Sequence, residues 1–195
     1  MIGGKCMSIS EMAFQVKEAS IRLAAAGTEL KNKALENIAR LLMERKDEII
    51  KANNEDLQRS REEKLAEPLL KRLKFDEAKI VDVIDGINSL IKLEDPVGKT
   101  LLSTELDEGL ELYRVTCPIG VVGIIFESRP DALVQISTLC LKSGNGVLLK
   151  GGSEARETNK ILAQIITEAT EEVGIPPNWI KLLETRADVN EMLKM

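Results

Sequence analysis

The chain has 195 residues, of which 44% are hydrophobic and 30% are charged, a composition typical of a globular protein rather than of a disordered segment. Its 27 lysines and arginines against 32 aspartates and glutamates give a net charge of −5, and 3% of its residues are aromatic. Both values argue against a nucleic-acid-binding protein, which needs a basic surface and aromatic stacking platforms. Because the sequence has no histidine, a Ser–His–Asp triad, a Cys–His dyad and a histidine-bound zinc ion are excluded.

The three cysteines, Cys6, Cys117 and Cys140, include no Cys-x-x-Cys pair. An odd number of cysteines without such pairing indicates free thiols in a reducing compartment. No apolar run reaches the length of about twenty residues that a membrane span needs, and the segment 1–10 lacks an apolar signal core. We therefore expect a cytoplasmic protein without a membrane partner.

The segment 1–95 is predicted to be helical. The charged stretch 45–67 is expected to form one solvated helix and a loop. Asp76 is expected to cap the helix that follows. Apolar residues recur with helical spacing in three segments, at 12–23, 35–42 and 80–90.

Strand patterns begin after Asp95. The segment 101–116 is predicted to form a β-hairpin, because Asp107-Glu108-Gly109 supplies a turn between two β-favouring runs. Three short apolar runs then alternate with helical segments, which indicates parallel strands joined by helices. We place these strands at 119–126, 147–149 and 180–183.

The order β-α-β-α-β-α predicts half of a doubly wound parallel sheet, in which ligands bind beyond the carboxyl ends of the strands. We expect Asp131 and Ser153 to cap the helices after the first two strands. Polar residues follow the ends of these two strands, as Glu127-Ser128-Arg129-Pro130 and Lys150-Gly151-Gly152-Ser153-Glu154. These segments, the 127–130 corner and the 150–154 corner, are the candidate functional site.

In the 150–154 corner, a strand ends in a cation, two glycines allow close approach of the backbone, and a helix begins. Backbone N–H groups at a helix N-terminus suit a phosphate, Lys150 adds positive charge, and Glu154 can accept hydrogen bonds from ribose hydroxyls. The alternative is an ordinary strand-to-helix turn with a surface lysine. Neither the usual dinucleotide fingerprint Gly-x-Gly-x-x-Gly nor a Walker A sequence is present.

In the 127–130 corner, Arg129 can clamp a carboxylate or a phosphate with two parallel hydrogen bonds. The alternative is a salt bridge from Arg129 to Glu127 or Asp131. We expect Cys117 and Cys140 to be packing residues, because neither thiol has a neighbouring helix N-terminus or an obvious base.

The segments 117–130 and 139–155, with shorter pieces at 31–35 and 174–177, resemble the aldehyde dehydrogenase superfamily. Within it they are most similar to the gamma-glutamyl phosphate reductase (glutamate-5-semialdehyde dehydrogenase) family. The Glu-Ser-Arg-Pro box at 127–130 distinguishes that family from general aldehyde dehydrogenases, which have a Trp-Asn pair near this place. The similarity runs from about residue 10 to the end of the sequence.

The resemblance implies an α/β fold of three parts. N-terminal helices at 1–95 would pack on a Rossmann-like doubly wound parallel sheet at 118–195, the partial NADP-binding domain, and a projecting β-hairpin at 96–117 would belong to the oligomerisation region. NADPH or NADP would place its adenosine ribose or 2′-phosphate at the 150–154 corner. The 127–130 corner would border the nicotinamide and the acyl group, with Arg129 as a candidate oxyanion or acyl-phosphate contact.

The reaction implied by the resemblance is NADPH-dependent reduction of gamma-glutamyl phosphate (L-glutamate 5-phosphate) to L-glutamate 5-semialdehyde, with release of phosphate, in proline biosynthesis. Family members carry the nucleophilic cysteine in a second domain, and no segment of this sequence matches it. We therefore expect that cysteine beyond the C-terminus of a truncated chain that has no turnover by itself. The implied partners are the small-molecule substrate, further copies in a homo-oligomer, and glutamate 5-kinase. The alternative is a non-catalytic NADP(H)-binding or interaction fragment.

Overall fold

The computed structural model describes residues 8–183 and 186–194. Within these residues five helices precede the first strand, which confirms the helical prediction for the described part of 1–95. The carboxylate of Asp76 accepts a hydrogen bond from the Lys79 N–H at 3.2 Å, as expected for the cap of the fifth helix. The helices are α1 (Ile9–Ala24), α2 (Thr28–Glu44), α3 (Lys46–Glu62), α4 (Glu67–Leu73) and α5 (Glu77–Lys92).

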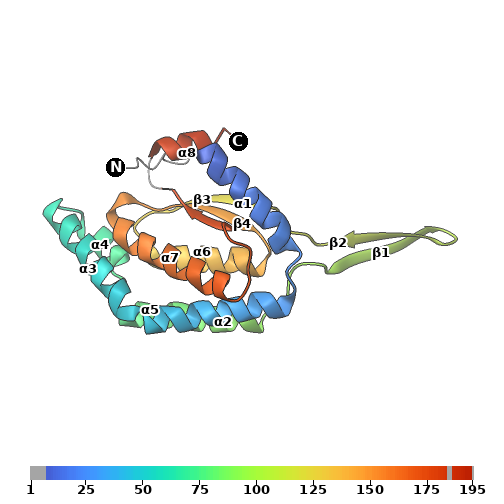
Figure 1. Cartoon of the computed structure of the whole chain (residues 1–195), viewed down its shortest axis with the longest axis horizontal. Coiled ribbons are helices and arrows are strands. Elements are labelled where there is room, and N and C mark those ends of the chain that lie inside the picture. Colours follow the sequence, from blue (N-terminus) through green and yellow to red (C-terminus); the bar gives the residue numbers. More distant parts are fainter. Residues whose placement is uncertain (1–7, 184–185, 195) are drawn as a thin grey trace.

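A β-hairpin projects from the body of the protein (Figure 1). Its strands β1 (Thr100–Asp107) and β2 (Leu110–Val115) pair antiparallel, which confirms the predicted hairpin. Every residue of both strands is exposed to solvent. A two-stranded hairpin is only marginally stable alone. This hairpin also carries apolar side chains that the body of the protein leaves exposed.

The remaining strands form a parallel sheet in the order β3 (Val121–Ile125), β4 (Gly146–Lys150) and β5 (Ile180–Leu182). The helices α6 (Pro130–Lys142) and α7 (Arg156–Glu172) make the two crossover connections. This arrangement confirms the predicted α/β fold with a parallel sheet.

Alternate residues of the central strand β4 face two different cores. Leu148 packs with Val16 of α1, whereas Val147 and Leu149 belong to the main core beneath α6 and α7. A strand that is buried on both faces must be apolar on both faces, which explains its continuous hydrophobic sequence.

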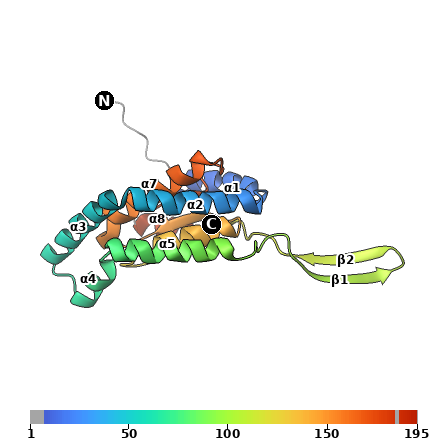
Figure 2. The ribbon, with the colours of Figure 1, turned by 90° about the horizontal axis from the view of Figure 1, so that it is seen from below.

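The elements stack as layers in Figure 1. Helix α1, with the short α8 (Arg186–Met192), covers one face of the sheet, and α6 and α7 cover the other. Helices α2, α3 and α5 pack on the outside of α6 and α7, and Figure 2 shows α2 and α5 side by side. The partition of the chain at residues 95 and 117 into three domains stays a prediction.

Two expectations about the helices are wrong. Helix α6 begins at Pro130 with Arg129 as its N-cap residue, so Asp131 lies in the first turn and does not cap the helix. Proline favours the first helical position because its fixed φ and missing N–H suit it. Helix α3 is not simply solvated, because Asn53, Asp56 and Ser60 form a buried polar stripe along it. None of the described helices is long and apolar enough to cross a membrane.

Candidate functional site

The two corners start from neighbouring strand ends. Ile125 of β3 is in register with Lys150 of β4, and the Phe126 N–H donates to the Lys150 carbonyl at 3.0 Å. Because parallel strands end at the same edge of a sheet, both corners leave this edge together.

A direct contact joins the corners. The backbone N–H of Ser128 donates to Oε1 of Glu154 at 2.7 Å, and the Ser128 hydroxyl donates to the same oxygen at 2.6 Å. Ser128 has a φ of +43° and is buried. Residues other than glycine rarely adopt this left-handed conformation, and backbone strain of this kind concentrates at functional sites.

The charge on Glu154 is stabilised by its surroundings. Burial raises the pKa of its carboxyl group, but hydrogen bonds from Ser128 and from its own backbone N–H, together with the Lys150 charge, outweigh burial and hold the pKa below its usual value. Glu154 is therefore ionised at neutral pH.

A cleft of about 700 Å³ lies between the corners. This volume falls within the range of about 300–1,000 Å³ that is typical of small-molecule sites. Arg129 and Pro130, although predicted for the site, do not line the cleft. The predicted residues that line it are Glu127, Ser128, Lys150, Gly151, Gly152, Ser153 and Glu154, joined by Leu65, Leu69, Val189 and Asn190 among others.

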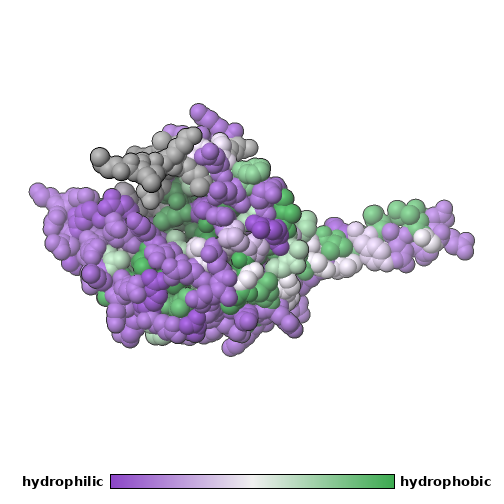
Figure 3. All heavy atoms as spheres, viewed as in Figure 1, coloured by the Kyte–Doolittle hydropathy of each residue, from purple (hydrophilic) through white to green (hydrophobic). Residues whose placement is uncertain are grey.

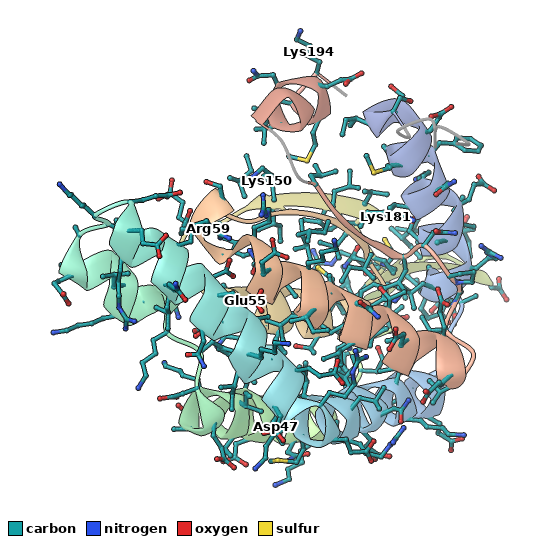
Figure 4. The ribbon with its side chains drawn as sticks, turned by 60° about the vertical axis from the view of Figure 1, so that its left-hand side comes forward. Asp47, Glu55, Arg59, Lys150, Lys181 and Lys194 are labelled. Carbon is teal, nitrogen blue, oxygen red and sulfur yellow. The ribbon has the colours of Figure 1, made fainter. Side chains whose placement is uncertain are left out.

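Lys150 is the cation of the cleft. It is 8% exposed, and its ammonium group donates to the Gly151 carbonyl. Figure 4 shows Lys150 at the end of its strand, close to the start of α7. A buried ammonium beside a cleft suits an anionic group such as a phosphate, which would replace the carbonyl as its partner. The cleft therefore combines an acceptor for hydroxyl groups, Glu154, with a cation.

The two glycines of the 150–154 corner lie directly against side chains of the same chain, which a larger residue would have to displace. A Cβ atom at Gly151 would overlap the amide nitrogen of Asn159, and one at Gly152 would overlap the Glu154 carboxylate. The space beside the glycines, which we expected a ligand to occupy, is thus filled by the side chains of Asn159 and Glu154. The absence of a side chain at Gly152 allows Glu154 to reach Ser128.

The start of α7 differs from the prediction. Ser153 opens a 3₁₀ turn, η1 (Ser153–Ala155), and α7 follows with Ala155 at the N-cap and no capping side chain from the cap residue. The carboxylate of Asp56 in α3 instead accepts from the N–H groups of Glu157 at 3.2 Å and Thr158 at 2.8 Å. The helix N-terminus that we expected to bind phosphate is therefore partly occupied by a protein carboxylate.

Arg129 makes the contact that we gave as its alternative. Its Nη2 donates to Oδ2 of Asp131 at 2.8 Å, and this hydrogen bond and charge raise the pKa of the guanidinium. The Arg129 side chain remains 55% exposed. The partner carboxylate of Asp131 is only 10% exposed, and the pair uses one Nη2 donor, so the other guanidinium donors of Arg129 remain able to bind another anion.

A second pocket, of about 280 Å³, adjoins the 150–154 corner on the side of β5 and the first turns of α7. Asn159 lines this pocket and is 2% exposed, and its Oδ1 atom has no hydrogen-bond partner in the described part of the chain. The sequence analysis did not identify Asn159, since an asparagine inside a helical pattern carries no distinguishing signal.

The two described cysteines differ from one another. Cys140 is buried, as expected, and burial raises the pKa of its thiol to about 11. Cys117 is exposed, so its prediction as a packing residue is wrong. Cys6 lies outside the described residues.

Comparisons with known proteins extend over nearly the whole chain. The sequence model of the aldehyde dehydrogenase family matches residues 7–194. The gamma-glutamyl phosphate reductase of Pelotomaculum thermopropionicum is 75% identical over 189 residues, which make up 97% of this chain and 44% of that protein. The protein of the same name from Ruminiclostridium cellulolyticum is 64% identical over the same shares of the two chains.

The fold has a close structural counterpart. The crystal structure of gamma-glutamyl phosphate reductase from Thermotoga maritima superposes with a TM-score of 0.93 at 41% identity, over 96% of this chain and 46% of that chain. The chain thus spans less than half the length of the relatives that it matches.

Proposed function

The chain belongs to the aldehyde dehydrogenase family, and from this premise we propose that it forms the nucleotide-binding part of an NADPH-dependent gamma-glutamyl phosphate reductase of proline biosynthesis. The reaction reduces gamma-glutamyl phosphate to glutamate 5-semialdehyde and releases phosphate. The identity of 75% to a relative of that name supports the assignment. The observation that carries it is the cleft shared by the two corners.

The residues of the cleft fit the polar groups of NADPH. In the proposal the Lys150 ammonium binds a phosphate of the adenosine half, and the ionised Glu154 accepts hydrogen bonds from ribose hydroxyls. Glu154 must then exchange at least part of its contact with Ser128 for the ribose. When bound, NADPH supplies the hydride for the reduction.

The 127–130 corner is assigned to the acyl-phosphate end. Arg129 would turn from Asp131 toward the substrate phosphate and bind it with two hydrogen bonds. Cys140 is unsuitable as a nucleophile, because a buried thiol with a pKa of about 11 is protonated at neutral pH. The proposal assigns the attacking thiolate to the part of the relatives that this chain does not span.

Titration of NADPH into the chain, followed by the fluorescence of the nicotinamide, tests the proposal. We expect saturable binding that is weakened about tenfold by Lys150→Ala, since hydrogen bonds to charged groups contribute about 1.5–3 kcal/mol. Lys181→Ala, on the edge strand β5 and outside the lining of the cleft, is the matched control. No saturable binding, or the same affinity for all three proteins, would contradict the assignment of the cleft.

The alternative is a chain that binds NADP(H) without chemistry of its own. Phosphate-dependent oxidation of glutamate 5-semialdehyde tests whether the chain catalyses the reaction by itself. We expect binding without turnover from this chain alone. Turnover that survives both Cys117→Ser and Cys140→Ser would show that the chemistry has been assigned wrongly.

We further propose that the hairpin joins the chain to a second copy in a cytoplasmic homo-oligomer. Figure 3 shows apolar surface, in green, on the projecting hairpin. Leu102, Leu112 and Tyr113 are each about half exposed or more. Exposed apolar groups of this extent mark interaction sites. Sedimentation of the chain alone tests self-association, and sedimentation with added glutamate 5-kinase tests that proposed partner.

A further inference from the structure

The carboxylate of Asp56 is buried at the junction of α3 and α7. Its side chain is 0% exposed, and besides the N–H groups of Glu157 and Thr158 it accepts the Thr158 hydroxyl at 2.7 Å. A side chain of α3 therefore caps a helix that lies about a hundred residues later, immediately after the 150–154 corner.

Arg59, one turn further along α3, holds the corner itself. Its Nη2 pairs with Oδ1 of Asp56 and also donates to the carbonyls of Ser153 at 3.2 Å and Glu154 at 3.3 Å. The two side chains together bind both ends of the turn η1. Asp56 accepts from the N–H groups that follow η1, and Arg59 donates to carbonyls within it. Figure 4 shows Arg59 at the same end of the molecule as Lys150.

These contacts are connected to the 127–130 corner through Glu154. Arg59 fixes the Glu154 carbonyl, and the carboxylate of the same residue receives both hydrogen bonds from Ser128. A displacement of η1 would therefore change the geometry of the whole cleft.

Asn53 anchors the same stripe of α3 on its other side. Its Nδ2 donates to the Thr158 hydroxyl at 3.2 Å and to the Leu73 carbonyl at 2.9 Å, and its Oδ1 accepts the Phe75 N–H at 2.8 Å. Asn53 thus holds the Thr158 hydroxyl, and Asp56 is held by Thr158 and Arg59. The orientation of Asp56 is therefore set by contacts within the protein and not by a ligand.

We propose that Asp56 and Arg59 are positioning residues for the nucleotide: they hold η1 where Glu154 and Lys150 face the cleft. This inference rests on the proposed function and assigns a role to α3 outside the cleft lining. If the pair served only to attach α3 to α7, an apolar pair would serve as well. An ion pair between Arg45, the N-cap residue of α3, and Glu168 of α7, at 2.6 Å, already joins these helices away from the cleft.

The test compares Arg59→Gln with Arg45→Gln, which removes the ion pair from Arg45 to Glu168 and the local pair from Arg45 to Glu48. Both proteins are titrated with NADPH, and amide hydrogen exchange is followed at Ser128. We expect Arg59→Gln to weaken binding about tenfold, which corresponds to about 1.4 kcal/mol, and to accelerate exchange of the Ser128 N–H. Arg45→Gln should change the affinity less than about twofold, because neither Arg45 nor Glu168 lines the cleft or contacts η1. Arg59→Lys should recover part of the affinity, since it retains a donor and the charge.

The possible outcomes separate the two claims. If the unchanged chain does not bind NADPH, the proposed function fails, and the positioning role with it. If the unchanged chain binds and Arg59→Gln binds equally well with unaltered exchange at Ser128, the positioning role alone is overturned. If Arg59→Gln loses its helical circular dichroism, Thr158→Val, which removes the hydroxyl donor to Asp56, provides the same comparison.

Discussion

Ser128 donates its backbone N–H and its hydroxyl to one oxygen of Glu154, at 2.7 and 2.6 Å. This relationship links the ends of β3 and β4 and stabilises the left-handed conformation of Ser128. A strained residue held by two charge-assisted hydrogen bonds can change conformation when a ligand competes for the carboxylate.

Ser128→Ala should raise the pKa of Glu154 toward its usual value, because the hydroxyl donor is lost. A carboxyl group with a lowered pKa stabilises the fold above its unfolded pKa of about 4.3, and this contribution disappears as the pH falls through the folded pKa. In the variant the contribution should therefore be smaller, and its loss should be complete at a higher pH. An NMR titration of the Glu154 carboxyl carbon measures the change, and identical titration curves would show that the hydroxyl does not hold the charge.

Asp95→Asn should destabilise the fold strongly. Asp95 pairs at 2.6 Å with Lys31, which is 1% exposed, and the buried Lys142 lies nearby. Burial lowers the pKa of the Lys142 ammonium, Asp95 opposes this effect and Lys31 adds to it. Without the carboxylate, the buried Lys31 ammonium loses its ion pair and Lys142 loses a nearby opposite charge, so we expect a loss of about 3–5 kcal/mol in urea unfolding.

Thr28→Ala is the matched control for that variant. It removes a single hydrogen bond, from the Thr28 hydroxyl to Asp95 at 2.8 Å, and should cost about 1 kcal/mol. Equal losses for the two variants would mean that the charge of Asp95 is not what stabilises this region.

The two described thiols should differ in reactivity. At pH 8, iodoacetamide should modify the exposed Cys117 but not Cys140, whose buried thiol has a pKa of about 11. Peptide mapping by mass spectrometry identifies the modified residue. Cys140 should become reactive in urea, and modification of Cys140 in the folded protein would contradict the packing that the structure shows.

Leu102→Lys combined with Leu112→Lys should reduce self-association without lowering the melting temperature. Both leucines are exposed on the hairpin, so the charges remain in water in the monomer but would be buried in an interface. Sedimentation velocity and thermal unfolding measure the two effects. Glu105→Gln on β1 is the control. Unchanged association of the leucine variant would remove the hairpin from the proposed interface.

The sequence predicted the elements whose signals are local. The hairpin turn at 107–109 and the apolar runs of β3, β4 and β5 each depend on a few adjacent residues, and the structure confirms them. The polar corners could be found for the same reason, because they interrupt buried strands.

The contacts that shape the site could not be predicted in this way. Asp56 lies in a charged stretch beside Glu55, and nothing in the local pattern shows that one is buried and the other is not. Its partner Thr158 is 102 positions away, so the cap exists only after α3 has packed on α7. Serine is a residue type that often caps helices, so Ser153 was the natural candidate. In the structure Asp56, which is distant in the sequence, accepts from the first N–H groups of α7 instead.

The central claim is that the two corners bind one NADPH molecule between them. NMR amide shifts recorded during addition of NADPH to the chain test it most directly. The account predicts that signals of Ser128 and of residues 150–154 move together with a single saturation curve. Shifts confined to one corner, or to residues elsewhere in the protein, would contradict it.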